Sequence, residues 1–245
     1  MSDGFPEDAA PRHEPIFKLP GVILLLLAVM IAVQAIIAWG EARTGNWIFA
    51  TFGFRPSDYA AGAPESLGGW ARLAWPFVTH GFVHGSWLHL FFNALWLMAV
   101  GTPLARRLGT PAFLGFYFFC GIAAVSLHWA LNAGSDATVV GASGAISGCM
   151  AGALRVMLAG SARYFLNKHP GIGSLAPIWD RRLVLVSVIF VAINLLTGLG
   201  FMPLPGAEGA QIAWLAHVGG FIAGLILMPI FDWAAGGGQR AYPTL

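Results

Sequence analysis

The chain has 245 residues, of which 57% are hydrophobic and only 10% charged, with a formal net charge of +2 at pH 7 and a mean hydropathy of +0.71. Soluble domains carry roughly 25% charged residues, so this composition excludes an ordinary soluble domain and indicates an integral membrane protein. Since no basic arm or face accompanies the small positive charge, we expect no nucleic-acid partner.

Six apolar segments are long enough to cross a bilayer, because a spanning helix needs about 20 mainly apolar residues. We place them at about 19–40, 86–104, 111–131, 141–160, 183–202 and 211–231. The sequence therefore predicts an all-α membrane protein, a bundle of six transmembrane helices in the lipid bilayer. An N-terminal tail (1–18) and a C-terminal tail (232–245) flank the membrane domain (19–231).

Basic residues set the predicted orientation, because Lys and Arg concentrate in cytoplasmic loops. If the N-terminus is cytoplasmic, all of the 13 Lys and Arg residues except Arg43, Arg55 and Arg72 fall inside. These three lie in the first outside loop, about 41–85, whose many aromatic residues suit the headgroup region. We expect both termini to be cytoplasmic, and the short tails and compact bundle favour a bacterial plasma membrane.

Two histidines precede the second span. His80 and His84 are four residues apart and could share a metal ion on a helix. His89, however, is turned roughly 140° away from His84 on a helix, and no Cys or carboxylate lies nearby. We therefore expect no metal site and interpret His80 and His84 as structural hydrogen-bonding residues that tie the first loop to the second span.

Polar side chains inside the spans are the candidates for chemistry, because an unpaired polar group in hydrocarbon is costly. The second span holds His89 and Asn93, the fourth begins with Ser143, and the sixth holds His217. These three spans run in the same direction, so distance from the span start measures depth at about 1.5 Å per residue. The four side chains therefore fall at similar depth, just below the outer surface.

Glycines on the fourth and sixth spans allow those two backbones to approach closely. They are Gly141, Gly144, Gly148, Gly220 and Gly224. Close approach brings the Ser143 hydroxyl within hydrogen-bond reach of His217, as nucleophilic catalysis requires. Backbone N–H groups at the helix start, helped by His89 and Asn93 on one helix face, could then stabilise an oxyanion.

Other residue types limit the chemistry. No Asp or Glu is placed to orient His217, so we predict a Ser-His dyad rather than a triad, without a cofactor. Asn194 in the fifth span has no evident partner, and we interpret it as a packing residue. Cys120 and Cys149 fall inside spans and are typical of small buried hydrophobic residues. Taken alone, the segment around Ser143 and Asn93 is more typical of helix packing, and His217 is equally typical of packing and of function; their coincidence at one depth favours catalysis.

Three sequence blocks resemble the rhomboid intramembrane serine proteases in their six-span bacterial form. They are HGFVHGSWLHLFFNALW at 80–96, GASG at 141–144 and AHVGGFIAG at 216–224. The resemblance implies Ser143 as nucleophile and His217 as base, with His89, Asn93 and the Ser143 backbone as the oxyanion hole. It also implies transmembrane segments of single-span proteins as substrates.

The resemblance extends beyond the catalytic residues. Gly220 and Gly224 match the small-residue pair that packs the histidine helix on the serine helix, and residues 200–210 match a flexible cap over the site. The fifth span matches the helix that moves aside for substrate. Two positions depart from many relatives: Pro76 stands where an Arg is usual, and Ser147 replaces a Tyr that packs on the base.

Two alternatives belong to other classes. A non-catalytic rhomboid-like protein could bind or escort transmembrane helices, but such proteins typically lose the Ser or the His, and this chain has both. A transporter could line its path with His and Asn, but it would place these groups near the bilayer midplane rather than near one face.

Overall fold

The computed structural model describes residues 19–59, 69, 73–165, 175–201 and 214–236, with residues 160–165 described by their backbone alone. The predicted N-terminal tail, most of the predicted cap (200–210) and the end of the C-terminal tail lie outside the described residues. The elements are α1 (Gly21–Trp39), α2 (Ala42–Phe52), η1 (Pro56–Tyr59), α4 (Pro76–Thr79), η2 (His80–Phe82), α5 (Trp87–Trp96), η3 (Leu97–Gly101), α6 (Thr102–Leu108), α7 (Thr110–Leu131), α8 (Ser143–Phe165), α9 (Arg181–Gly198) and α10 (Trp214–Ala234).

The fold is an all-α bundle, as the hydropathy predicted. Five helical segments in the described part are long and apolar enough to cross a membrane: α1, the continuous run from α5 to α6, α7, α9 and α10. In α8 the apolar stretch is shorter, Ser143–Ala159. The predicted spans agree with these helices to within a few residues, and the count of six crossings depends on α8.

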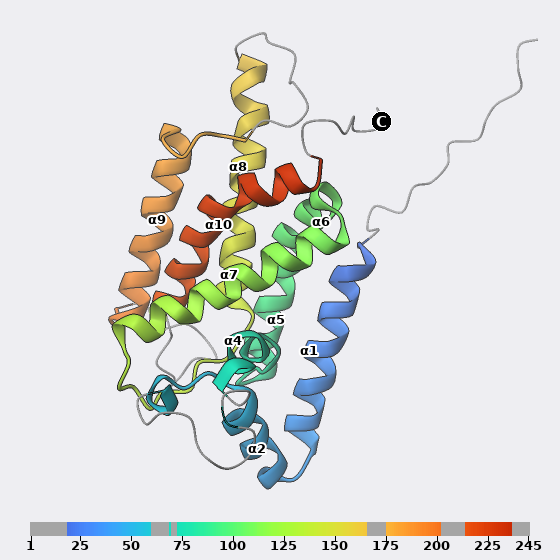
Figure 1. Cartoon of the computed structure of the whole chain (residues 1–245), viewed down its shortest axis with the longest axis vertical. Coiled ribbons are helices and arrows are strands. Elements are labelled where there is room, and N and C mark those ends of the chain that lie inside the picture. The colour runs from blue at the N-terminus through green and yellow to red at the C-terminus, as the bar shows by residue number, and fades with distance from the viewer. Residues whose placement is uncertain (1–18, 60–68, 70–72, 166–174, 202–213, 237–245) are drawn as a thin grey trace, which may run out of the picture.

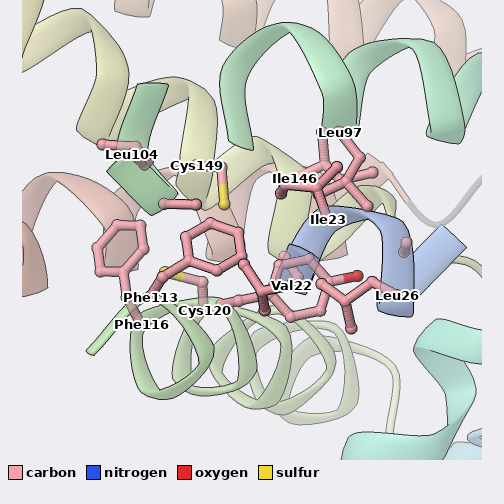
Figure 2. Close-up of a cluster of buried hydrophobic side chains, with 14 of the residues drawn as sticks. Val22, Ile23, Leu26, Leu97, Leu104, Phe113, Phe116, Cys120, Ile146 and Cys149 are labelled. Carbon is pink, nitrogen blue, oxygen red and sulfur yellow. The ribbon is translucent and has the colours of Figure 1, made fainter. Parts of the chain in front are cut away.

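The centre of the bundle is formed by α7, α8 and α10, which pack against one another. Figure 1 shows α1 along one edge of the molecule and α9 along the opposite edge. The largest cluster of buried apolar side chains joins α1 to this centre (Figure 2). It includes Ile23 from α1, Leu97 from η3, Phe116 from α7 and Cys149 from α8, all fully buried. Both predicted buried cysteines therefore serve packing, and Cys120 and Cys149 are free thiols.

The second span changes its helical geometry part-way. Between α5 and α6, residues Leu97–Gly101 form a π-helical turn, which a hydropathy pattern does not reveal. In the last turn of α6, Arg107 donates from Nε and Nη2 to the two carboxylate oxygens of Asp232, at 2.7 and 2.9 Å. This buried ion pair ties α6 to α10, and α10 continues to Ala234, past the predicted boundary at 231.

The described part of the first loop is held by hydrogen bonds within the loop and to the segment before α8. Trp75 Nε1 donates to the carbonyl of Thr51 at 2.7 Å, and Thr79 Oγ1 donates to that of Phe52 at 2.9 Å. Phe54 exchanges backbone hydrogen bonds with Val139, in the segment that precedes α8. The first loop, in which Pro76 begins α4, is therefore hydrogen-bonded to the segment that leads to Ser143.

Candidate active site

The two predicted catalytic side chains are in contact. Ser143 is the first residue of α8 and His217 lies in the first turn of α10. His217 Nε2 and Ser143 Oγ are 2.7 Å apart, which is hydrogen-bonding distance. Both residues are half-buried, so solvent or a substrate can reach them. The hydroxyl of a serine in this position can pass its proton directly to the imidazole.

Close packing of α8 on α10 produces this contact. A Cβ atom on Gly220 would collide with the carbonyl group of Gly144, and one on Gly224 would collide with that of Gly148. A Cβ on Gly144 would lie 2.6 Å from Ala124 Cβ of α7. Since real Cβ atoms do not approach so closely, these positions exclude any side chain. The glycines therefore set the separation at which a serine on one helix reaches a histidine on the other.

Asn194 of α9 completes the set of partners of His217, and here the sequence interpretation was wrong. The Asn194 Oδ1 atom lies 2.7 Å from His217 Nδ1, so this residue is not a simple packing residue. Asn194 lies four residues before the end of α9 at Gly198. Because α9 runs in the opposite direction to α10, depth counted from the end of the fifth span, rather than from its start, would have placed Asn194 level with His217.

His89 and Asn93 lie on one face of α5, next to the segment that leads into α8. Gly141 has φ +110°, and a Cβ there would be 2.7 Å from His89 Cε1 and Nε2 and 3.8 Å from Asn93 Nδ2. Asn93 is buried and donates from Nδ2 to the carbonyl of His89 at 3.0 Å. That bond uses one of the two amide hydrogens. Gly141 lies two residues before α8 and has a left-handed backbone. Because it has no side chain, the His89 ring can pack against it, close in sequence to the serine.

The segment before α5 is hydrogen-bonded to Gly141, two residues before the serine. The backbone N–H of Gly141 donates to the carbonyl of His80 at 2.9 Å, and His80 Nδ1 bonds to the carbonyl of Pro76 at 2.8 Å. His84 is fully buried with its ring 5.0 Å from that of His89 and no hydrogen-bond partner for its ring nitrogens among the described residues. His84 packs against His89, and the hydrogen-bonding role predicted for it stays a prediction.

Burial controls the charge of these two histidines, which precede the membrane-spanning helix. Desolvation lowers the pKa of His80 to about 4. For His84, desolvation and then the neighbouring His89 lower the pKa to about 3. Both rings are therefore neutral at pH 7. Within the described residues, no group of three or more His, Cys, Asp and Glu side chains is gathered to hold a metal ion.

Ser147, one turn after Ser143, makes no hydrogen bond to the base among the described residues. Its hydroxyl donates to the carbonyl of Ser143 at 2.8 Å. The hydrogen bonds of the His217 ring in the described part are those to Ser143 and Asn194, one on each nitrogen. The side chain that holds the base therefore comes from α9 and not from the helix that carries the serine.

Comparison with known proteins places the chain among its relatives. Residues 71–233, about two thirds of the chain, match the family described as the Rhomboid domain. The chain belongs to the rhomboid family. The rhomboid protease GlpG of Serratia proteamaculans (strain 568) is 30% identical over 153 residues, which are 62% of this chain and 46% of that protein. GlpG of Yersinia pestis (strain Pestoides F) is 31% identical over the same shares.

The aligned part of this rhomboid chain spans about half the length of these curated relatives. The family match, residues 71–233, includes Ser143, His217 and the α8–α10 contact. With its apolar helices, membership of this family makes the chain an integral membrane protein.

Proposed function

We propose that this protein is an intramembrane serine endopeptidase that cleaves transmembrane or juxtamembrane segments of membrane proteins. The observation that carries the proposal is the 2.7 Å contact between Ser143 Oγ and His217 Nε2 at the starts of two tightly packed helices. The similarity to proteins named rhomboid proteases supports the same reaction. We propose single-span proteins as substrates and place the site near the outer face of a bacterial plasma membrane, with both termini cytoplasmic and six crossings.

The reaction proceeds in two steps. Ser143 Oγ attacks the peptide carbonyl carbon while His217 Nε2 takes the hydroxyl proton, and the C–N bond breaks as His217 gives that proton to the leaving amine. A water molecule then attacks the acyl-serine ester, again with His217 as base, and regenerates the hydroxyl. No metal ion, cofactor or nucleic acid takes part.

An oxyanion forms on the carbonyl oxygen in each step, and donors around Ser143 stabilise it. The first N–H groups of a helix lack intrahelical partners, so the backbone N–H of Ser143 is available. We propose that the remaining amide hydrogen of Asn93 and the ring of His89 add side-chain donors, because Gly141 brings both beside the serine. Preorganised donors of this kind are worth roughly 10²- to 10³-fold in kcat.

Cleavage of a single-span reporter protein in liposomes tests the proposal. The wild type is expected to cut the reporter, whereas Ser143→Ala and His217→Ala are expected to be inactive although they remain folded. Asn93→Ala is expected to retain the contact between serine and histidine while losing roughly 10²-fold in kcat. A wild type that neither cuts nor reacts with a fluorophosphonate, in folded protein, would support a non-catalytic helix-binding protein instead.

A further inference from the structure

The two hydrogen bonds of Asn194 fix which of its side-chain atoms faces the histidine. Asn194 Nδ2 donates to the carbonyl of Phe190 at 2.8 Å. A carbonyl can only accept, so the amide nitrogen must face Phe190 and the amide oxygen must face His217. The 2.7 Å contact with His217 Nδ1 is therefore a contact with an acceptor.

That orientation selects one tautomer of the histidine. An amide oxygen accepts a hydrogen bond, so His217 Nδ1 must carry the proton that is donated to Asn194. In the neutral ring the other nitrogen, Nε2, is then the acceptor, and it faces Ser143 Oγ at 2.7 Å. This is the protonation pattern that a general base needs, because the lone pair points at the hydroxyl proton.

The turn of α9 that carries Asn194 is docked on the turn of α10 that carries His217. Phe190, one turn before Asn194, stacks on Phe221, one turn after His217, with ring centroids 4.4 Å apart and planes at 18°. Elsewhere α9 is thinly packed, since Leu183 is its one buried residue and all of α9 is described. The stacked rings and the Asn194–His217 bond are thus neighbouring contacts, one turn apart on each of the two helices.

We propose that Asn194 is a positioning residue, which holds the His217 ring in the tautomer and orientation that accept the Ser143 proton. The inference rests on the proposed protease function and adds a third residue to it: Asn194 of α9 orients the His217 ring that accepts the Ser143 proton. It also makes correct seating of α9 on α10 a condition for an aligned base. The Ser147 hydroxyl donates to the Ser143 carbonyl, so it is not the group that orients the His217 ring.

Three variants separate positioning from a general effect on the fold. Asn194→Leu removes the acceptor at similar side-chain volume. Asn194→Asp keeps an oxygen facing Nδ1. Thr197→Val is the matched control, because Thr197 lies on the next turn of α9 and donates to the Ile193 carbonyl at 2.8 Å without touching the base. All are measured by reporter cleavage (kcat and KM) and by the rate and end-point of fluorophosphonate labelling of Ser143.

We expect Asn194→Leu to lower kcat and the labelling rate by roughly 10- to 100-fold, less than the ~10⁴-fold that a charged triad aspartate supplies. Its KM and its labelling end-point should stay near wild type, since the site is folded but its base is misaligned. Asn194→Asp should recover at least part of the rate, and Thr197→Val should match wild type.

Equal labelling rates in wild type and Asn194→Leu would overturn the positioning role while leaving the proposed protease function intact. A reduced labelling end-point at unchanged rate per labelled molecule would also overturn it, because that result reports loss of folded protein. Absence of labelling in the wild type itself would instead reject the proposed function on which the inference rests.

Discussion

The two helices that flank His217 contact α10 in opposite ways. Between α8 and α10 the backbones nearly touch, with Gly220 against Gly144 and Gly224 against Gly148. Between α9 and α10 each described contact involves a side chain: the Phe190–Phe221 stack, the Asn194–His217 bond, and the Trp214 ring against the backbone of Gly198. Many apolar side chains of α9 point away from the bundle, and Leu185 and Val188 are each 60% exposed. One helix is fixed by backbone shape and the other by a few side chains.

This difference separates two requirements of a membrane-embedded nucleophile. Ser143 and His217 must keep a constant separation, and glycine-mediated packing provides it because backbone atoms cannot rearrange as side chains do. The helix that supplies Asn194 is held by fewer contacts, and much of its apolar surface is exposed. If the two contacts differ in this way, a change at the α8–α10 contact should cost more than a change on the exposed face of α9.

The largest effect is expected from adding a single methyl group to the rigid contact. Gly220→Ala places a Cβ on the Gly144 carbonyl, so α8 and α10 must separate, and we expect loss of activity and destabilisation by about 3 kcal/mol or more. Thermal unfolding in detergent and reporter cleavage measure both effects. Gly134→Ala is the control, because a Cβ there meets nothing within 4 Å. Wild-type activity in Gly220→Ala would contradict the packing account.

The next largest effect is expected from breaking the buried ion pair between Arg107 of α6 and Asp232 of α10. Asp232→Ala leaves the buried Arg107 guanidinium without its bidentate acceptor, and we expect a loss of about 3 kcal/mol in the free energy of unfolding. The control is Asp58→Ala, which removes an exposed pair with Arg55 at 3.8 Å and should cost under about 1 kcal/mol. Comparable losses in the two variants would show that burial does not decide the strength of the pair.

Two leucines of α9, one buried and one exposed, test whether this helix is packed on one side only. Leu183 is 1% exposed and Leu185 is 60% exposed. We expect Leu183→Ala to cost about 2 kcal/mol through the cavity it leaves. For Leu185→Ala we expect a change within about 0.5 kcal/mol, as is usual for exposed positions. Unfolding of both variants in the same detergent makes the comparison, and a large loss in Leu185→Ala would indicate a packed face.

The smallest effect is a pH dependence of stability that arises from His80 and His84. The pKa values of His80 and His84 are lowered on folding to about 4 and about 3, so the unfolded chain, with values near 6.5, binds more protons between these limits. Stability should therefore fall as pH falls below about 6.5, by roughly 1 kcal/mol between pH 7 and pH 6 for the two rings together.

Unfolding temperatures measured from pH 8 to pH 5 test this expectation. In His80→Asn the amide nitrogen replaces the ring donor to Pro76, and in His84→Phe a ring remains beside His89. Each variant should show a shallower decline on the acid side than the wild type. An unchanged slope in both variants would assign the decline to other groups.

The sequence predicted the spans and the catalytic contact better than the partners of the base. Hydropathy reports apolar length directly, so the predicted spans match the helices to within a few residues. The contact of Ser143 with His217 follows from equal depth on helices whose glycines permit close approach. Gly141 was expected on a helix, but it lies before α8 with a positive φ, a local detail that composition does not encode.

Asn194 was missed because hydropathy gives no information on which helices are neighbours. An isolated amide in an apolar span is consistent with many packings, and only the tertiary arrangement brings α9 beside the first turn of α10. The π-helical turn at Leu97–Gly101 was missed for a related reason, since its residues are as apolar as those of an ordinary helix. Depth counted from both ends of every span would have found the Asn194 candidate.

The most direct test of the central claim is the site and rate of fluorophosphonate labelling in folded protein, read by mass spectrometry. We expect one adduct per chain, on Ser143, formed rapidly in the wild type and not detectably in His217→Ala. An adduct on another residue, or equal labelling rates in wild type and His217→Ala, would contradict the claim that Ser143 and His217 act as nucleophile and base.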